Sequence, residues 1–290
     1  MSISSKSDRW DTNSVRWNAP YEYSFAYRLF KIHYTEINNA YWASVPAYNT
    51  IKKEVLTYSV KNPIKKPLDF FIVHDEDDRR IAQTFEKWKS YHELYGKFNR
   101  LNMMFLATSC MEVYLRSIVS LALESKPSVL FYGHILVDGV LPMIRDNRYS
   151  CYADKKYPFH HIVDNICSGR WIDRYNTYEK YFGTNKFLCD NLDRLDEYRK
   201  KRNEYAHYYG RSSKEYENPI LLRSKELNSI SHSNLISYLD LIYNVITYID
   251  KHLYRKYIGG YELIKYIYQN HIFEKLKGTD RDKARKLTDI

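Results

Sequence analysis

Three side chains in the second half of the chain combine the groups that acid–base chemistry on a phosphodiester needs: Arg202, Asn203 and His207. An arginine stays charged, and its planar fork of donors matches the oxygens of a phosphate. A histidine titrates near neutral pH and can take or give a proton. RNA carries its own nucleophile in the 2′-hydroxyl, so a base and a charge clamp are enough to cleave it without a metal.

The segment that carries these residues, 187–209, is expected to be a helix with Gly210 as its C-cap. Arg202 falls on the continuation of the apolar face, and a buried guanidinium needs an acceptor or an anion. Asn203 and His207 are four residues apart and share one side of the helix, so Asn203 could orient the imidazole or hold a substrate oxygen. The apolar face itself is marked by Leu188, Leu192 and Leu195.

At these residues the sequence resembles the HEPN superfamily, whose signature is Arg, a polar residue that is often Asn, a few further residues and then His. The resemblance implies a bundle of four to five helices. It also implies, for many members, a metal-independent ribonuclease that pairs two motifs across a dimer interface. The run Ser109–Arg116 resembles the first long helix of that family, where an acidic residue precedes a basic one on the same face, as Glu112 and Arg116 do here.

The resemblance extends to one regulatory position. In HEPN toxins that are paired with nucleotidyltransferase antitoxins, the His is followed by any residue and then by a Tyr that the antitoxin adenylylates. Tyr209 corresponds to that Tyr, although those toxins are much shorter than this chain. An antitoxin or another regulatory protein is therefore an expected partner.

Other interpretations of the same residues stay open. Arg202 and His207 could be the solvated basic end of a helix, where cations are favourable without any function. Glu112 and Arg116 could form an ordinary ion pair between successive turns. Arg28 and His33 have the same spacing as the candidate pair, but apolar Leu29 follows that Arg and the segment resembles an ordinary aromatic helix.

The surrounding pattern predicts an all-α chain, because only 9 Gly and 8 Pro interrupt it and no strand-like alternation occurs. One or two aromatic-rich helices are expected within 21–60, one helix within 78–124, and another within 261–278. The helix within 78–124 should carry four residues on one side: Leu106, Cys110, Val113 and Leu121. The clearest amphipathic stripe, within 231–260, consists of Leu235, Leu239, Ile242, Ile246, Ile249 and Leu253.

These elements predict an antiparallel helical bundle with helical and loop insertions. The proline- and lysine-rich run at 61–67 marks the best boundary. We expect an aromatic-rich N-terminal helical extension at 1–79, a HEPN-like helical domain at 80–277 with an insert at about 128–186, and a flexible basic tail at 278–290.

Composition narrows the class of protein. The formal net charge is +10, which suits a polyanionic partner such as RNA, DNA or an anionic membrane without choosing among them. The polar N-terminus is unlike a signal peptide, and no uninterrupted run of about 18 apolar residues occurs, so we expect a cytoplasmic protein with no membrane contact. No cofactor or metal is expected, because the irregular spacing of the possible ligands matches no zinc template: Cys151, His160, His161, Cys167 and Cys189.

The leading hypothesis is a metal-independent endoribonuclease, a toxin or antiviral effector that works as a homodimer, with Arg202, Asn203 and His207 as its catalytic residues. Glu112, Arg116 and Tyr209 would be supporting or regulatory. The second hypothesis is a HEPN-like module without catalysis that binds RNA, a nucleotide or a partner protein. A third is a helical scaffold assembled through residues 1–79, which predicts that Arg202 and His207 are exposed, separate and unpaired.

Overall fold

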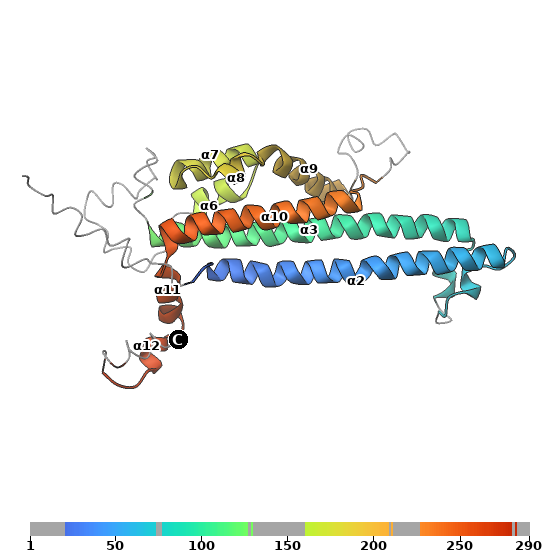
Figure 1. The fold of residues 1–290 in the computed structure, drawn as a ribbon, viewed down its shortest axis with the longest axis horizontal. Coiled ribbons are helices and arrows are strands. Elements are labelled where there is room, and N and C mark those ends of the chain that lie inside the picture. Colours follow the sequence, from blue (N-terminus) through green and yellow to red (C-terminus); the bar gives the residue numbers. More distant parts are fainter. Residues whose placement is uncertain are drawn as a thin grey trace, which may run out of the picture. The chain divides into compact units, whose positions relative to one another are not determined.

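The fold was analysed in a computed structural model, which describes residues 21–73, 77–126, 129, 160–208, 210, 227–279 and 282. Every regular element in these ranges is helical, as Figure 1 shows. The predicted all-α class is therefore confirmed for this part of the chain. The abundance of long stretches without Gly or Pro is the physical reason, because little in them interrupts the hydrogen bonding of a helix.

Three long helices dominate Figure 1: α2 (Phe25–Lys61), α3 (Phe85–Ser125) and α10 (His232–Leu253). α10 continues as one π-helical turn, Tyr254–Ile258, and short 3-10 turns occur at Pro67–Asp69 and Asp78–Arg80. The shorter α-helices are α6 (His160–Cys167), α7 (Trp171–Phe182), α8 (Lys186–Cys189), α9 (Leu192–Tyr208), α11 (Tyr261–Gln269) and α12 (Ile272–Lys275).

The chain divides into two compact units, and each is assembled from segments far apart in the sequence. Unit 1 comprises Met1–Arg28, Val113–Leu192 and Val245–Ile290, and unit 2 comprises Leu29–Glu112 and Asp193–Asn244. The long helices α2, α3 and α10 each contribute residues to both units. The boundary predicted after residue 79 falls inside unit 2, which contains Arg202, Asn203, His207 and Glu112.

The core confirms the amphipathic stripe predicted for the helix that is now α10. All six of its residues are buried, with at most 2% of each exposed: Leu235, Leu239, Ile242, Ile246, Ile249 and Leu253. The one-sided pattern survives because α10 buries the face that its apolar residues mark.

The face predicted for α3 is wrong. Leu106 is 39% exposed and Val113 is 60% exposed. Met104 and Met111 are buried instead, together with the polar Thr108, whose hydroxyl lies 2.6 Å from the Tyr238 hydroxyl. The prediction assumed that polar residues are exposed. Thr108 does not follow that rule, because a buried polar side chain with a hydrogen-bond partner is tolerated in a core.

The single helix predicted for residues 187–209 is two helices, α8 and α9, separated at Asp190 and Asn191. Asn185 begins the first of them, because its side chain accepts a hydrogen bond from the Leu188 N–H at 3.1 Å. Gly210 ends the second, as predicted: its φ is +74° and its N–H donates to the Glu204 carbonyl at 3.0 Å. The predicted last helix is also divided, at His271, whose φ is +51°.

Two buried carboxylates hold the start of α2 within unit 1. Asp250 accepts hydrogen bonds from the Ser24 N–H at 3.1 Å, from the Ser24 hydroxyl and from the Tyr114 hydroxyl at 3.0 Å. Glu262 accepts from the Phe25 N–H at 2.9 Å. The first N–H groups of a helix lack partners within it, so these carboxylates supply the acceptors that the chain otherwise misses.

One described helix, α3, is long and apolar enough to cross a membrane when judged by length and composition alone. Half of the relevant stretch is buried inside the structure, and a core helix of a soluble protein passes the same test. The absence of an uninterrupted apolar run argued against a membrane location. Length and composition of α3 leave that location open.

Candidate active site

Arg202 lies on α9 and is held between two residues of α3. Its Nη2 donates to Glu112 Oε2 at 3.2 Å, and its Cζ lies 5.2 Å from the centroid of the Phe105 ring. About a quarter of each charged side chain is exposed, 23% for Arg202 and 28% for Glu112. The expectation that a guanidinium on this face needs an acceptor is met by a residue 90 positions away in the sequence.

The guanidinium of Arg202 has N–H groups that form no hydrogen bond with the described residues. It has five N–H groups, and two of them are used by Glu112 and by Asn203, whose Oδ1 accepts from Nη1 at 3.2 Å. Its Nε is buried and has no hydrogen-bond partner among the described residues. A buried donor without an acceptor is destabilising, so an anion at this position would be bound favourably.

His207 lies just past the next turn of α9 and is exposed. Its ring contacts that of Tyr208 edge-on, with 6.4 Å between centroids, and it makes no hydrogen bond within the described part of the chain. Asn203 thus binds Arg202 and leaves the imidazole without the orienting bond that the sequence allowed for. The structure brings Arg202, Asn203 and Glu112 together and leaves His207 open to solvent at the same end of the helix.

The supporting residues are placed separately. Arg116 forms an exposed ion pair with Asp164 at 2.7 Å, in unit 1. Glu112, for which an ion pair with Arg116 was the ordinary interpretation, binds Arg202. Tyr209, the position that corresponds to the modified Tyr of the antitoxin-paired toxins, lies outside the described residues.

Packing behind Arg202 fixes the position of α9. The Tyr198 ring stacks on Tyr238 of α10 at 4.0 Å between centroids, and the Tyr205 ring meets Phe105 edge-on at 6.0 Å. Burial raises the pKa of the Tyr238 hydroxyl well above its usual value, so this hydroxyl stays protonated at neutral pH. The aromatic contacts hold the Arg202 backbone against α3 and α10.

Sequence reasoning missed Phe105. This residue and Glu112 are seven positions apart on α3, a spacing of two turns that places both on one face. An aromatic ring and a carboxylate at that spacing match the two needs of an arginine, a face to stack on and a charge to bind. That signal was present in the sequence, but nothing in it connected α3 with Arg202.

No family model, no curated protein and no solved structure matches the chain. The geometry of the site therefore has to carry any functional argument by itself. The possible metal ligands add nothing to it, since the described residues contain no group of three or more His, Cys, Asp or Glu that could hold an ion. Cys151, one of the residues considered for zinc, lies outside the described ranges.

Proposed function

We propose that the protein is a metal-independent endoribonuclease with Arg202, Asn203 and His207 at its centre, on a HEPN-like helical bundle formed by unit 2. The observation that carries the proposal is the state of Arg202. Glu112 and Asn203 orient its guanidinium at 3.2 Å each, and it retains unused donors five residues before an exposed histidine on the same helix. An oriented cation with spare donors and an exposed imidazole on the same helix are the groups that phosphodiester cleavage requires.

The proposed reaction needs two proton transfers. His207 takes the proton from a 2′-hydroxyl, and the resulting oxygen attacks the adjacent phosphorus while the 5′-oxygen leaves. A second acid must protonate that leaving oxygen, and we assign this role to His207 of a second copy of the chain in a symmetric dimer. Arg202 binds the phosphate and stabilises its charge in the transition state. The products are a 2′,3′-cyclic phosphate and a 5′-hydroxyl.

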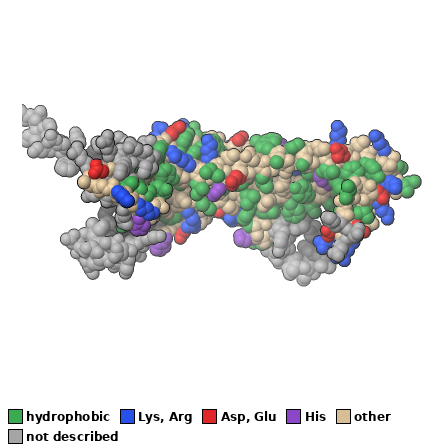
Figure 2. All heavy atoms as spheres, turned by 90° about the horizontal axis from the view of Figure 1, so that it is seen from below, with side chains coloured by type: hydrophobic (Ala, Val, Ile, Leu, Met, Phe, Trp, Pro, Cys, Tyr) green, Lys and Arg blue, Asp and Glu red, His purple; other side chains and the backbone are tan. Residues whose placement is uncertain are grey.

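Charge alone does not define a path for RNA. The net charge of +10 favours a polyanion. On the face drawn in Figure 2, however, the Lys and Arg side chains of the described residues are scattered among acidic and apolar ones. The specificity must therefore come from particular residues.

The test is cleavage of single-stranded RNA by the purified full-length protein in the presence of EDTA. Wild type should release fragments with cyclic phosphate ends, and His207→Ala should lose at least about a hundredfold in rate, in line with the usual contribution of a general base. Arg202→Lys should also lose activity, because Lys keeps the charge but not the fork that holds Glu112 and a phosphate together.

The chain offers a matched control. His33 is an exposed helical histidine five residues after an arginine, as His207 is, and it lies on α2. His33→Ala should therefore cleave like wild type. Equal cleavage by wild type and by His207→Ala would refute the assignment of the site.

The second candidate is a HEPN-like module that binds RNA, a nucleotide or a protein without cleaving it. The observation in its favour is that the His207 imidazole has no hydrogen bond to orient it within the described residues. Expression in a host distinguishes the two. A ribonuclease should be toxic and His207→Ala should relieve the toxicity, whereas a binding module should be tolerated in both forms.

A further inference from the structure

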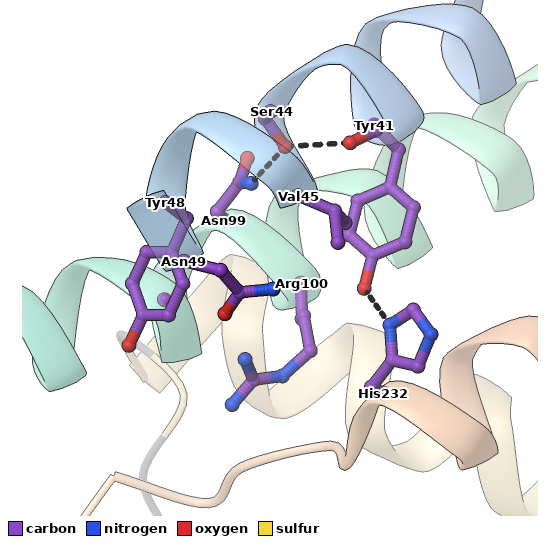
Figure 3. A pocket seen from close by; sticks show the side chains of 9 residues that line it. Tyr41, Ser44, Val45, Tyr48, Asn49, Asn99, Arg100 and His232 are labelled. Carbon is purple, nitrogen blue, oxygen red and sulfur yellow. Dashed lines mark hydrogen bonds between the residues drawn. The ribbon is translucent and has the colours of Figure 1, made fainter. Parts of the chain in front are cut away.

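Unit 2 contains a cavity of about 200 Å³ formed by α2, α3 and the beginning of α10. Figure 3 shows it from close by. Amides, phenols, an imidazole and one guanidinium line it, and none of the lining residues is acidic. They are Tyr41, Ser44, Val45, Tyr48, Asn49, Gly96, Asn99, Arg100 and His232.

Arg100 supplies a fixed positive charge to this cavity. Its Nε donates to the Ile230 carbonyl at 2.6 Å, which holds the guanidinium plane in one orientation. Its two Nη groups form no hydrogen bond or ion pair within the described part of the chain. An oriented guanidinium with two free nitrogens is suited to the paired oxygens of a phosphate or carboxylate.

Tyr48 lines one wall of the cavity and is backed by two further aromatic rings. The Tyr48 ring stacks on His92 at 4.0 Å and 12°, and His92 stacks on Trp88 at 4.8 Å and 18°. Gly96 makes room for Tyr48, since a Cβ at that position would lie 2.9 Å from the Tyr48 hydroxyl oxygen. Stacked rings in a basic environment are the platforms on which proteins bind unpaired bases.

Two amides complete the lining. Asn99 donates its Nδ2 to the Ser44 hydroxyl at 3.0 Å, which leaves its Oδ1 as an acceptor. The Asn49 amide has no hydrogen-bond partner among the described residues and is exposed. On the opposite side the Tyr41 hydroxyl and His232 Nδ1 are 2.6 Å apart and fix that wall. A free amide offers a donor and an acceptor side by side, as the edge of a nucleobase does.

We propose that this cavity binds one unpaired RNA nucleotide, with its phosphate on Arg100 and its base beside Tyr48 and Asn49. At about 200 Å³ the cavity exceeds the roughly 150 Å³ that holds a benzene ring and falls short of the roughly 300 Å³ that drug-sized ligands need, so it holds the base while part of the nucleotide lies outside it. The choice of RNA rests on the proposed function. The observations on the cation, the aromatic wall and the free amide do not depend on the proposed function.

The experiment measures binding without cleavage. A fluorescently labelled, fully 2′-O-methylated oligonucleotide has no 2′-hydroxyl to attack, so its anisotropy reports affinity whether or not the protein is a ribonuclease. Arg100→Gln in the full-length protein should weaken binding at least tenfold. It should also reduce the slope of log affinity against log salt by about 0.7, the value for one phosphate contact on a single strand. Lys53→Gln removes the same charge from an exposed position on α2 and should change affinity less than twofold.

Small ligands test the chemistry of the cavity. Uridine monophosphate should bind more tightly than uridine, and Arg100→Gln should make the two affinities similar. Asn49→Ala removes an exposed side chain that holds nothing in place, so it should fold normally. It should weaken the nucleotide several-fold and leave inorganic phosphate unchanged. Inorganic phosphate that binds as tightly as the nucleotide would overturn the proposal in favour of a simple anion site.

The proposal would also be overturned if Arg100→Gln bound the oligonucleotide like wild type, or if Lys53→Gln lost as much affinity. These results are separable from the cleavage assay. Loss of nucleotide binding in Arg100→Gln together with equal cleavage by wild type and His207→Ala would sustain the cavity and refute the ribonuclease site. Nucleotide binding by Arg100→Gln like that of wild type, together with loss of cleavage in His207→Ala, would refute the cavity and sustain the ribonuclease site.

Discussion

Replacing Glu262 by Gln should remove much of the pH dependence of stability in this protein. Glu262 is 3% exposed, and burial raises the pKa of its carboxyl from 4.5 to about 7, against the lowering effect of the Phe25 N–H that it accepts. Its Oε1 and the Tyr254 hydroxyl are both buried, and neither forms a hydrogen bond of ordinary geometry. A proton on the carboxyl removes the charge that burial disfavours.

The raised pKa of Glu262 determines how the stability changes with pH. A carboxyl whose pKa is raised on folding stabilises the native state most when both states are protonated, and that stability is lost as the pH rises through the folded pKa. The shift from 4.5 to about 7 spans 2.5 pH units. At 1.36 kcal/mol per unit this corresponds to about 3 kcal/mol of unfolding free energy lost between pH 4.5 and pH 8.

Urea unfolding followed by circular dichroism at both pH values measures this difference. Gln mimics the protonated carboxyl, so Glu262→Gln should resemble wild type near pH 4.5 and exceed it by about 3 kcal/mol near pH 8. Subtracting the two proteins cancels the other titrating groups, among them Asp250, whose pKa burial also raises. Glu36→Gln, an exposed change on α2, is the control and should track wild type. A constant difference between Glu262→Gln and wild type across the pH range would refute the reasoning.

Three further changes test the fold and the site by urea unfolding. Ile246→Ala removes a fully buried side chain and should cost about 2–5 kcal/mol; a loss below 1 kcal/mol would mean that α10 is not packed as described. Gly210→Ala should destabilise by at least about 1 kcal/mol, because φ there is +74° and a Cβ would lie 2.6 Å from Leu227 Cδ1; an unchanged midpoint would contradict this. Glu112→Gln should cost only about 1 kcal/mol, since its pair with Arg202 is a quarter exposed, and a loss above 3 kcal/mol would indicate a fully buried charge.

The sequence predicted the fold best where one helix face decides burial. The stripe on α10 could be recognised because its residues recur every three or four positions and all face the core. Gly210 could be recognised because only glycine adopts its backbone conformation readily. On α3 the same approach failed at Val113, because buried Thr108 pairs with Tyr238 and polarity no longer reports exposure.

The candidate site was predictable in its local part alone. Arg202, Asn203 and His207 are visible as a motif, but Glu112 binds Arg202 across 90 residues and no local spacing encodes that contact. The cavity beside Arg100 is still less visible. Its lining comes from α2, α3 and α10, and each residue taken by itself is an ordinary polar or aromatic side chain on a helix. Only packing brings these residues together.

The division of the chain has a consequence for the order in which the protein can form during translation. A ribosome delivers the chain from its N-terminus at about 5–20 residues per second. Unit 2 receives its last residue at Asn244, whereas unit 1 draws on residues as late as Ile290. The nascent beginning of α2 must therefore remain without the carboxylates of Asp250 and Glu262 until residues beyond the last one of unit 2 have been made. Unit 2 can complete its assembly first.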